Sequence, residues 1–155
     1  MKLLPFVVML TGCLKYATLT PKNSQFQFDY SVPEKSQDEI WTSARNYFAT
    51  TYKDLNAVME VQDKSNGIFI GKGTTTWTLM GNSCPTYHSI RFKAKDGKAR
   101  LRLEVIEEAP IQCRGWPVPS EEGLIQVADS LKQIGKNLDK ALKSSADAGQ
   151  GFEDF

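Results

Sequence analysis

The chain has 155 residues, of which 41% are hydrophobic and 24% charged, an ordinary globular composition that is sufficient for one modest core. Its 19 basic and 18 acidic residues nearly balance. This balance excludes a general electrostatic drive toward nucleic acid or an anionic surface.

The N-terminal residues have the features of an export signal. Met1-Lys2 carries a positive charge, and Leu3 to Leu10 is an apolar run that is too short to span a bilayer. The run ends in Leu10-Thr11-Gly12-Cys13, which resembles the lipobox of bacterial lipoproteins, whose cysteine is diacylated and becomes the mature N-terminus. We therefore expect a signal peptide over residues 1–12 and a lipidated Cys13 with a tether over residues 13–25. An ordinary secretory peptide and a buried N-terminal strand are the alternatives.

This resemblance also implies a location. The lipid would anchor the mature protein to a membrane of the cell envelope, and loss of Lys2 leaves basic and acidic residues in equal number. Leu14 rather than Asp follows the cysteine. In Gram-negative lipoproteins this implies sorting to the outer membrane, with the domain facing the periplasm.

The globular domain is expected to begin with a strand and a helix. Phe26, Phe28 and Tyr30 alternate with polar residues, which is the period-2 pattern of a half-buried strand. Ser36 and Glu39 form a capping box, and apolar residues follow at helical spacing. Residues 36–51 are therefore predicted to form a helix that buries an aromatic stripe in the core.

Two further strands are predicted over residues 57–62 and 68–77, around a five-residue turn that ends in Asn-Gly. Two glycines interrupt the second of these strands, which indicates a bulge or a close approach of another chain segment. Residues 79–85 are expected to form a loop.

The strongest local pattern is a β-hairpin from Tyr87 to Ile106 with its turn at Asp96-Gly97, a pair suited to a two-residue turn with positive φ at both positions. On one face this register pairs mostly apolar residues: His88 with Val105, Ile90 with Leu103, Phe92 with Leu101 and Ala94 with Ala99. The other face pairs Ser89 with Glu104, Arg91 with Arg102 and Lys93 with Arg100. A slip of one residue would bury several cations, so the register is well determined.

Two cysteines flank this hairpin. With Cys13 lipidated, Cys84 and Cys113 form an even pair in an oxidising compartment, which predicts a disulfide. Strict register would place Cys84 opposite residue 109, and the proline-containing segments beside both cysteines are expected to leave the strands and absorb the offset. Such a bond would stabilise the fold by on the order of 2–4 kcal/mol.

The last part of the chain contains the clearest helix. Prolines keep residues 107–119 irregular, with Trp116 among them. Ser120 can cap the following helix, whose apolar stripe continues to Leu142. Residues 144–155 are predicted to form a flexible tail, so the domain extends over residues 26–143.

The order strand, helix, four strands, helix predicts an α+β fold, with a single antiparallel sheet of about five strands and both helices on its apolar face. The chain resembles a family of uncharacterised bacterial lipoproteins whose globular part is similar to one repeat of the TATA-box-binding protein (TBP). The resemblance lies in the helix from Ser36 to Thr51, in the pattern from Val61 to Thr75 with its Gly67-Ile68-Phe69-Ile70-Gly71-Lys72-Gly73 segment, and in the two long strands that follow. It implies a TBP-like fold and transfers no catalytic residue. DNA binding by the eukaryotic namesake uses two repeats, whereas this exported chain has one, so no nucleic acid is expected as a partner.

The preferred candidate site is the basic face of the hairpin, with Trp116 in the neighbouring loop. The basic residues are Arg91, Lys93, Arg100 and Arg102, extended by Lys95 and Lys98 at the turn. Like charges that lie directly opposite each other cost stability unless something compensates them. Acidic residues on neighbouring strands are one explanation, and an anionic partner is the other: lipid headgroups, an envelope polymer or an acidic envelope protein. The sequence favours a lipid-anchored binding or assembly module, without enzymatic activity or cofactor.

A second hypothesis is a small envelope enzyme or metal-binding protein centred on His88, Cys84 and Cys113. Their spacing matches no strong zinc pattern, and an oxidising compartment favours the disulfide. His88, the only histidine, falls on the inner face of the hairpin, where we interpret it as a buried, hydrogen-bonded imidazole.

Overall fold

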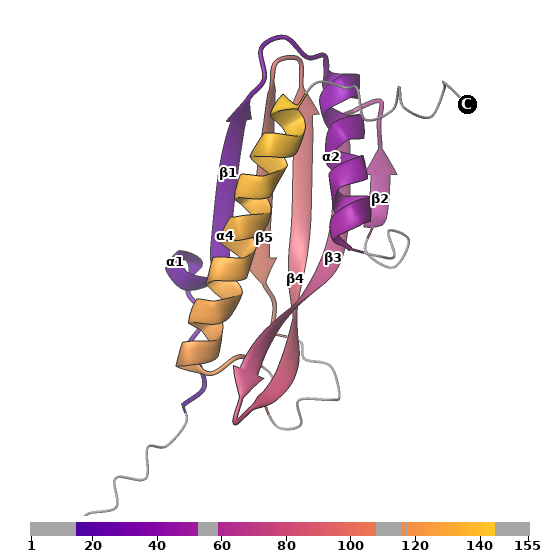
Figure 1. Ribbon diagram of the computed structural model, residues 1–155. Coiled ribbons are helices and arrows are strands. Elements are labelled where there is room, and N and C mark those ends of the chain that lie inside the picture. The colour runs from indigo at the N-terminus through magenta and orange to yellow at the C-terminus, as the bar shows by residue number, and fades with distance from the viewer. Residues whose placement is uncertain (1–14, 53–58, 108–115, 117, 145–155) are drawn as a thin grey trace, which may run out of the picture.

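The computed structural model describes residues 15–52, 59–107, 116 and 118–144. Five strands form one antiparallel sheet in the order β1-β5-β4-β3-β2. The strands are β1 (Gln25–Ser31), β2 (Met59–Asp63), β3 (Ile68–Leu79), β4 (Asn82–Lys95) and β5 (Lys98–Val105), and the helices are α1 (Pro21–Ser24), α2 (Gln37–Thr51) and α4 (Glu121–Lys143). Helices α2 and α4 lie on the same face of the sheet, and no described helix covers the other face (Figure 1). This architecture confirms the predicted α+β fold.

Both long helices begin at the predicted caps. The Ser36 hydroxyl accepts a hydrogen bond from the Glu39 N–H at 3.3 Å, and the Glu39 carboxylate accepts one from the Ser36 N–H at 2.8 Å. The Ser120 hydroxyl accepts one from the Gly123 N–H at 3.0 Å. These bonds satisfy backbone N–H groups that have no partner within the first helical turn. The two helices therefore begin directly after these serines.

The core lies between the helices and the inner face of the sheet. Phe48 of α2, Phe69 of β3 and Phe92 of β4 are buried, with the Phe69 and Phe92 rings stacked at 4.6 Å between centroids. Helix α4 adds a continuous buried stripe of Leu124, Val127, Leu131, Leu138 and Leu142. Each such side chain contributes about 1.5–3 kcal/mol when it leaves water, so these contacts hold the helices on this face.

The register of the β4–β5 hairpin agrees with the prediction in every pair from His88–Val105 to Ala94–Ala99. Its turn differs, because Gly97 has φ of 74° whereas Asp96 keeps a negative φ. The physical reason is tertiary: the Asp96 carboxylate accepts a hydrogen bond from the Gln37 N–H at 2.8 Å, and the Gly97 N–H donates to the Lys35 carbonyl at 2.9 Å. The start of α2 therefore holds this turn in its conformation.

The prediction of a loop over residues 79–85 is wrong, because β3 and β4 form a second tight hairpin. Leu79 pairs with Asn82 across Met80 and Gly81, whose φ values are 48° and 80°. Positive φ at both turn residues matches the twist of the flanking strands. Cys84 and Pro85 therefore lie inside β4 rather than beyond it, and the missing N–H of Pro85 is tolerated because the pairing with β5 ends at His88.

Residues 15–24 also differ from the predicted tether. Tyr16 forms a β-bridge with Ser120, and the N–H of the buried Ala17 donates to the Pro119 carbonyl at 2.9 Å. The segment then forms α1, which leads directly into β1. The predicted signal peptide, Cys13 and the tail after residue 144 lie outside the described residues. No helix in the described part of the chain is long and apolar enough to span a membrane.

Candidate functional site

The basic residues of the hairpin lie on the sheet face that faces away from α2 and α4. We call this surface the open face and define it by the outward side chains of β1, β2, β3, β4 and β5. Because side chains alternate along a strand, burial of Ile90 and Phe92 on the inner face places Arg91 and Lys93 on the open face. The register sets Arg91 opposite Arg102, Lys93 opposite Arg100 and Lys95 opposite Lys98. All six of these cations are exposed.

Strand β1 compensates part of this charge. The Arg100 guanidinium donates to the Asp29 carboxylate at 2.6 Å, which lowers the pKa of Asp29 and raises that of Arg100. Arg102 donates to the side-chain carbonyl of Gln27 at 3.0 Å, a neutral partner. Acidic partners on neighbouring strands therefore account for one of the four predicted cations.

The two cations of β4 have different neighbours. Across β3, Arg91 faces Ile70 and Lys93 faces Ile68. In the part of the chain that the structure describes, neither Arg91 nor Lys93 forms an ion pair. The repulsion between Arg91 and Arg102 is thus uncompensated, whereas Asp29 offsets part of the charge that Lys93 faces across the strand.

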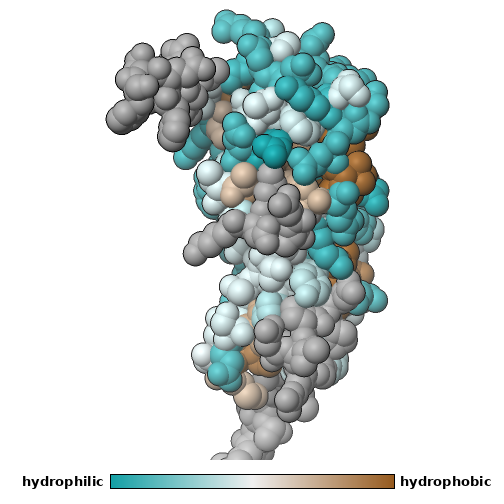
Figure 2. Space-filling view, turned by 90° about the vertical axis from the view of Figure 1, so that its right-hand side faces the viewer, coloured by the Kyte–Doolittle hydropathy of each residue, from teal (hydrophilic) through white to brown (hydrophobic). Residues whose placement is uncertain are grey.

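The open face has an aliphatic half beside the basic half. Ile68 and Ile70 point outward from β3, and Val61 of β2 lies opposite Ile70 with 46% of its surface exposed. Figure 2 shows hydrophobic surface on the side that carries β2 and β3, next to hydrophilic surface. This half was not predicted, although the alternation of Ile68, Phe69 and Ile70 could have indicated it once Phe69 was assigned to the core.

A hollow of about 590 Å³ lies at the hairpin-turn end of the open face. Its lining includes four cations, Lys93, Lys95, Lys98 and Arg100, with Asp29 as the one carboxylate. Since Asp29 already accepts from Arg100, the hollow retains a net positive charge. Carboxylate or phosphate groups are the ligands that such a surface attracts.

Trp116, which was predicted together with the binding face, does not lie on the open face. Its ring lies 4.4 Å from that of Tyr16 and 5.8 Å from that of Trp77, measured between centroids. Trp77 is buried on the inner face beneath the first turn of α4. Trp116 is therefore held on the helix side of the sheet.

His88 is part of the inner face and is fully buried. Its Nε2 forms a 2.7 Å hydrogen bond with the Tyr52 hydroxyl, and its Nδ1 a 3.1 Å bond with the Thr75 hydroxyl. A Cβ at Gly73 would lie 2.5 Å from Nε2, which explains the glycine and the close approach predicted for this strand. Burial lowers the pKa of His88 to about 4 and favours the neutral ring. Both ring nitrogens are therefore hydrogen-bonded, as expected for an imidazole with a structural role.

The geometry does not bring Cys84 and His88 together. They lie four residues apart on the same strand, which separates their Cα atoms by about 13 Å, whereas two ligands of one zinc ion lie within about 4 Å of each other. The described residues contain no cluster suited to a metal ion. Cys84 is disulfide-bonded, and Cys13 and Cys113 lie outside the described residues.

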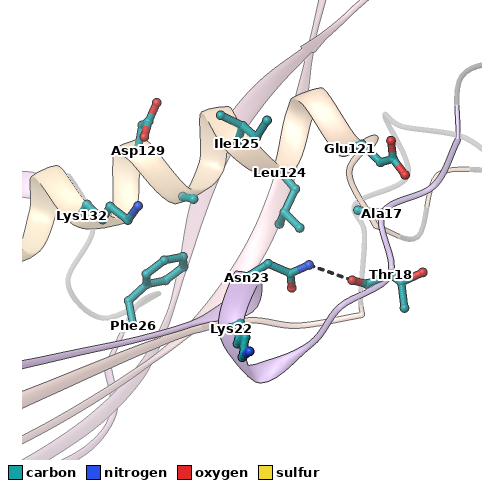
Figure 3. Close-up of a pocket in the computed structure, with 11 residues that line it drawn as sticks. Ala17, Thr18, Lys22, Asn23, Phe26, Glu121, Leu124, Ile125, Asp129 and Lys132 are labelled. Atoms are coloured by element: carbon teal, nitrogen blue, oxygen red, sulfur yellow. Dashed lines mark hydrogen bonds between the residues drawn. The ribbon is translucent and has the colours of Figure 1, made fainter.

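A second groove, of about 440 Å³, lies between α4 and the segment that precedes β1 (Figure 3). Phe26 and Leu124 contribute apolar surface, and Lys132 stands over the Phe26 ring at 5.8 Å. Lys22, Glu121 and Asp129 complete a rim of mixed charge. The mixture gives this groove no clear preference for an anion or a cation.

Comparisons with known proteins agree with the fold. A TBP-like protein from Parabacteroides distasonis has a TM-score of 0.62 at 8% identity, over 82% of this chain and 97% of that one. A DUF4468 family protein from Bacteroides ovatus has a TM-score of 0.52 at 12% identity, over 87% and 93% of the two chains. No protein of curated function matches this sequence. The family model described as a domain of unknown function (DUF4468) with TBP-like fold matches residues 26–108, more than half of the sequence, so the chain belongs to the DUF4468 family.

Proposed function

We propose that this protein is a lipid-anchored module of the cell envelope whose open face binds an anionic envelope protein or polymer. The observation that carries the proposal is the row of cations in the middle of a sheet face that no described helix covers. Arg91 and Lys93 oppose two further cations, and their other neighbours are aliphatic. A domain selected for stability alone would avoid this arrangement, because each like-charge pair opposes folding.

The spacing of the cations indicates what kind of ligand would fit. Opposed residues on β4 and β5 are separated by about 5 Å, and successive outward residues on one strand by about 7 Å. A polymer or an acidic protein segment that presents several carboxylate or phosphate groups at these intervals would pair with Arg91, Lys93, Arg100 and Arg102 together. A single small anion would engage only part of the row.

The anchor is supported by the sequence from Met1 to Cys13. Its test is the intact mass of the full-length protein extracted from bacterial membranes with detergent. We expect a chain that begins at Cys13 and is heavier by a diacylglyceryl lipid. Measured again after reduction, the same sample should gain two mass units if Cys84 and Cys113 are bonded, our proposed pairing. A chain without lipid would overturn the anchored location.

The binding face is tested by retention on cellulose phosphate, a polyanionic matrix, with the full-length protein in a neutral detergent. Arg91→Glu/Arg102→Glu should elute at a lower NaCl concentration than wild type, because exposed charges act only over a Debye length of about 10 Å and the reversal therefore affects ligands bound at the open face. Lys136→Glu/Lys140→Glu is the matched control, because it changes the net charge equally on exposed positions of α4. Equal loss of retention in both variants would mean that net charge alone governs binding.

The natural partner can be sought with the same pair of variants. Wild-type protein coupled to beads should bind an envelope component. The control Lys136→Glu/Lys140→Glu should bind the same component, and Arg91→Glu/Arg102→Glu should not. Thermal unfolding of all three proteins checks that the exposed substitutions leave the domain folded. Identical components on wild type and on the open-face variant would refute a binding role for this face.

A further inference from the structure

Three of the large hydrophobic side chains that are exposed in the described chain lie at one end of the molecule. Met80 is 81% exposed, Ile125 64% and Tyr16 52%, whereas the fourth, Val61, lies on the open face. Met80 is in the β3–β4 turn and Ile125 is in the second turn of α4. Single exposed hydrophobic residues are common on protein surfaces, so it is the grouping of these three at one end that indicates a contact surface.

Several contacts hold these three residues at the same end. The Thr78 N–H, beside the turn that carries Met80, donates to the Gln126 side chain at 3.0 Å. Tyr16 forms its bridge with Ser120, immediately before α4. In Figure 1 the β3–β4 turn, the start of α4 and the N-terminal segment all lie at the lower end of the molecule. We call this the anchor end, defined by Tyr16, Met80 and Ile125.

The anchor end is also where the chain leaves toward Cys13. The Lys15 carbonyl accepts a hydrogen bond from the Glu121 N–H at 3.3 Å, and the Ala17 N–H donates to Pro119, so residues 15–17 are fixed against the start of α4. Cys13 is three residues before Tyr16. Three residues of extended chain span about 11 Å, so a lipid on Cys13 would hold this end within that distance of the membrane surface.

We propose that the anchor end rests on the bilayer, with Met80 and Ile125 inserted among the lipids and Tyr16 at the interface. This inference rests on the proposed lipid anchoring and specifies the surface that meets the membrane. The charges around it are mixed: Lys15, Lys22 and Lys132 stand near Glu121, Glu122 and Asp129. The contact is therefore apolar and requires no anionic lipid.

This orientation decides what the open face can reach. Strand β4 runs from Asn82 at the anchor end to Lys95 at the hairpin turn, a length of about 43 Å. With the anchor end on the membrane, the cations of Lys95 and Lys98 stand far from the headgroups of that membrane. The anionic partner of the open face is then an envelope protein or polymer and not the lipid surface.

The tryptophans provide the test. Trp116 contacts Tyr16 and Trp77 contacts Trp116, so both report on the anchor end. Trp41 is bonded to the Ile68 carbonyl, about 30 Å farther along β3 from Trp77. Full-length lipidated protein is reconstituted in phosphatidylcholine vesicles whose acyl chains carry bromine, which quenches tryptophan fluorescence at short range. We expect quenching in wild type, at least a twofold loss in Met80→Ser/Ile125→Ser, and no change in Val61→Ser.

The outcomes separate this inference from the proposed function. Intact mass is measured on the same vesicles: a lipidated protein whose quenching is equal in wild type and Met80→Ser/Ile125→Ser overturns the contact but leaves the anchor standing. A mass without lipid overturns both. Sedimentation in neutral detergent tests the alternative that the anchor end binds a second copy of the chain. A wild-type dimer that becomes a monomer in Met80→Ser/Ile125→Ser would assign the anchor end to a dimer interface and overturn the membrane contact. Unchanged thermal unfolding of the exposed-site variants keeps the comparison valid.

Discussion

His88 should make the stability of this domain sensitive to acidification. Its ring is fully buried, and in the described structure only the hydroxyls of Tyr52 and Thr75 bond to it, with no charged partner. Burial lowers its pKa from 6.5 to about 4 in the folded state. Below pH 6.5 His88 is protonated in the unfolded chain but stays neutral in the folded protein. The free energy of unfolding therefore falls as pH falls, until His88 is also protonated in the folded state near pH 4. The loss is about 2 kcal/mol between pH 7 and pH 5 and about 3 kcal/mol by pH 4.

Urea unfolding at pH 7, 6, 5 and 4 measures this dependence directly. Exposed carboxylates such as Asp29 also titrate toward acid pH, so the informative quantity is the difference between wild type and His88→Gln, in which their contribution cancels. Glutamine can hydrogen-bond to both hydroxyls and has no proton to gain. We expect the variant to be less stable at pH 7, and the stability difference to shrink by about 2 kcal/mol at pH 5. Parallel curves for the two proteins would refute the assignment of the acid sensitivity to His88.

Three further predictions concern packing, a buried hydrogen bond and the disulfide. Gly123→Ala would place a Cβ inside the contact distance of the Trp77 ring, so chemical denaturation should show a loss of about 1–3 kcal/mol despite the better helix propensity of alanine. Ser130→Ala on the exposed side of α4 should be nearly neutral. Tyr30→Phe removes the 2.9 Å hydrogen bond from the buried hydroxyl to the Gly135 carbonyl and should cost about 1–2 kcal/mol in the same assay, with an unchanged m-value. Reduction of the bond at Cys84 should lower the unfolding midpoint by an amount equivalent to about 2–4 kcal/mol, and a midpoint indifferent to reductant would contradict a stabilising disulfide.

The elements that depend on local patterns could be predicted from the sequence. Alternation over 88–94 and 99–105 requires one hairpin register, because any slip buries cations. Ser36 and Ser120 mark helix starts since their hydroxyls satisfy donors only a few residues away. The exposed position of Arg91 and Arg102 follows from the same alternation, so the placement of these cations on one sheet face could be predicted from periodicity alone.

Other features depend on contacts between distant segments, and tertiary structure alone decided them. Residues 15–24 contain no periodic pattern, yet the backbone of Ala17 and Lys15 bonds to the start of α4, about a hundred residues later. Met80-Gly81 forms a tight turn because Trp77 and Cys84 pair across it, although Pro85 indicated a loop. Gly97 and Asp96 adopt a turn set by the loop before α2. The anchor end is likewise invisible in the sequence, because Tyr16, Met80 and Ile125 come to lie at one end of the molecule only when the sheet has formed and α4 has packed on it. Periodicity along the chain shows which residues prefer water, but which distant segments share a surface depends on the tertiary contacts.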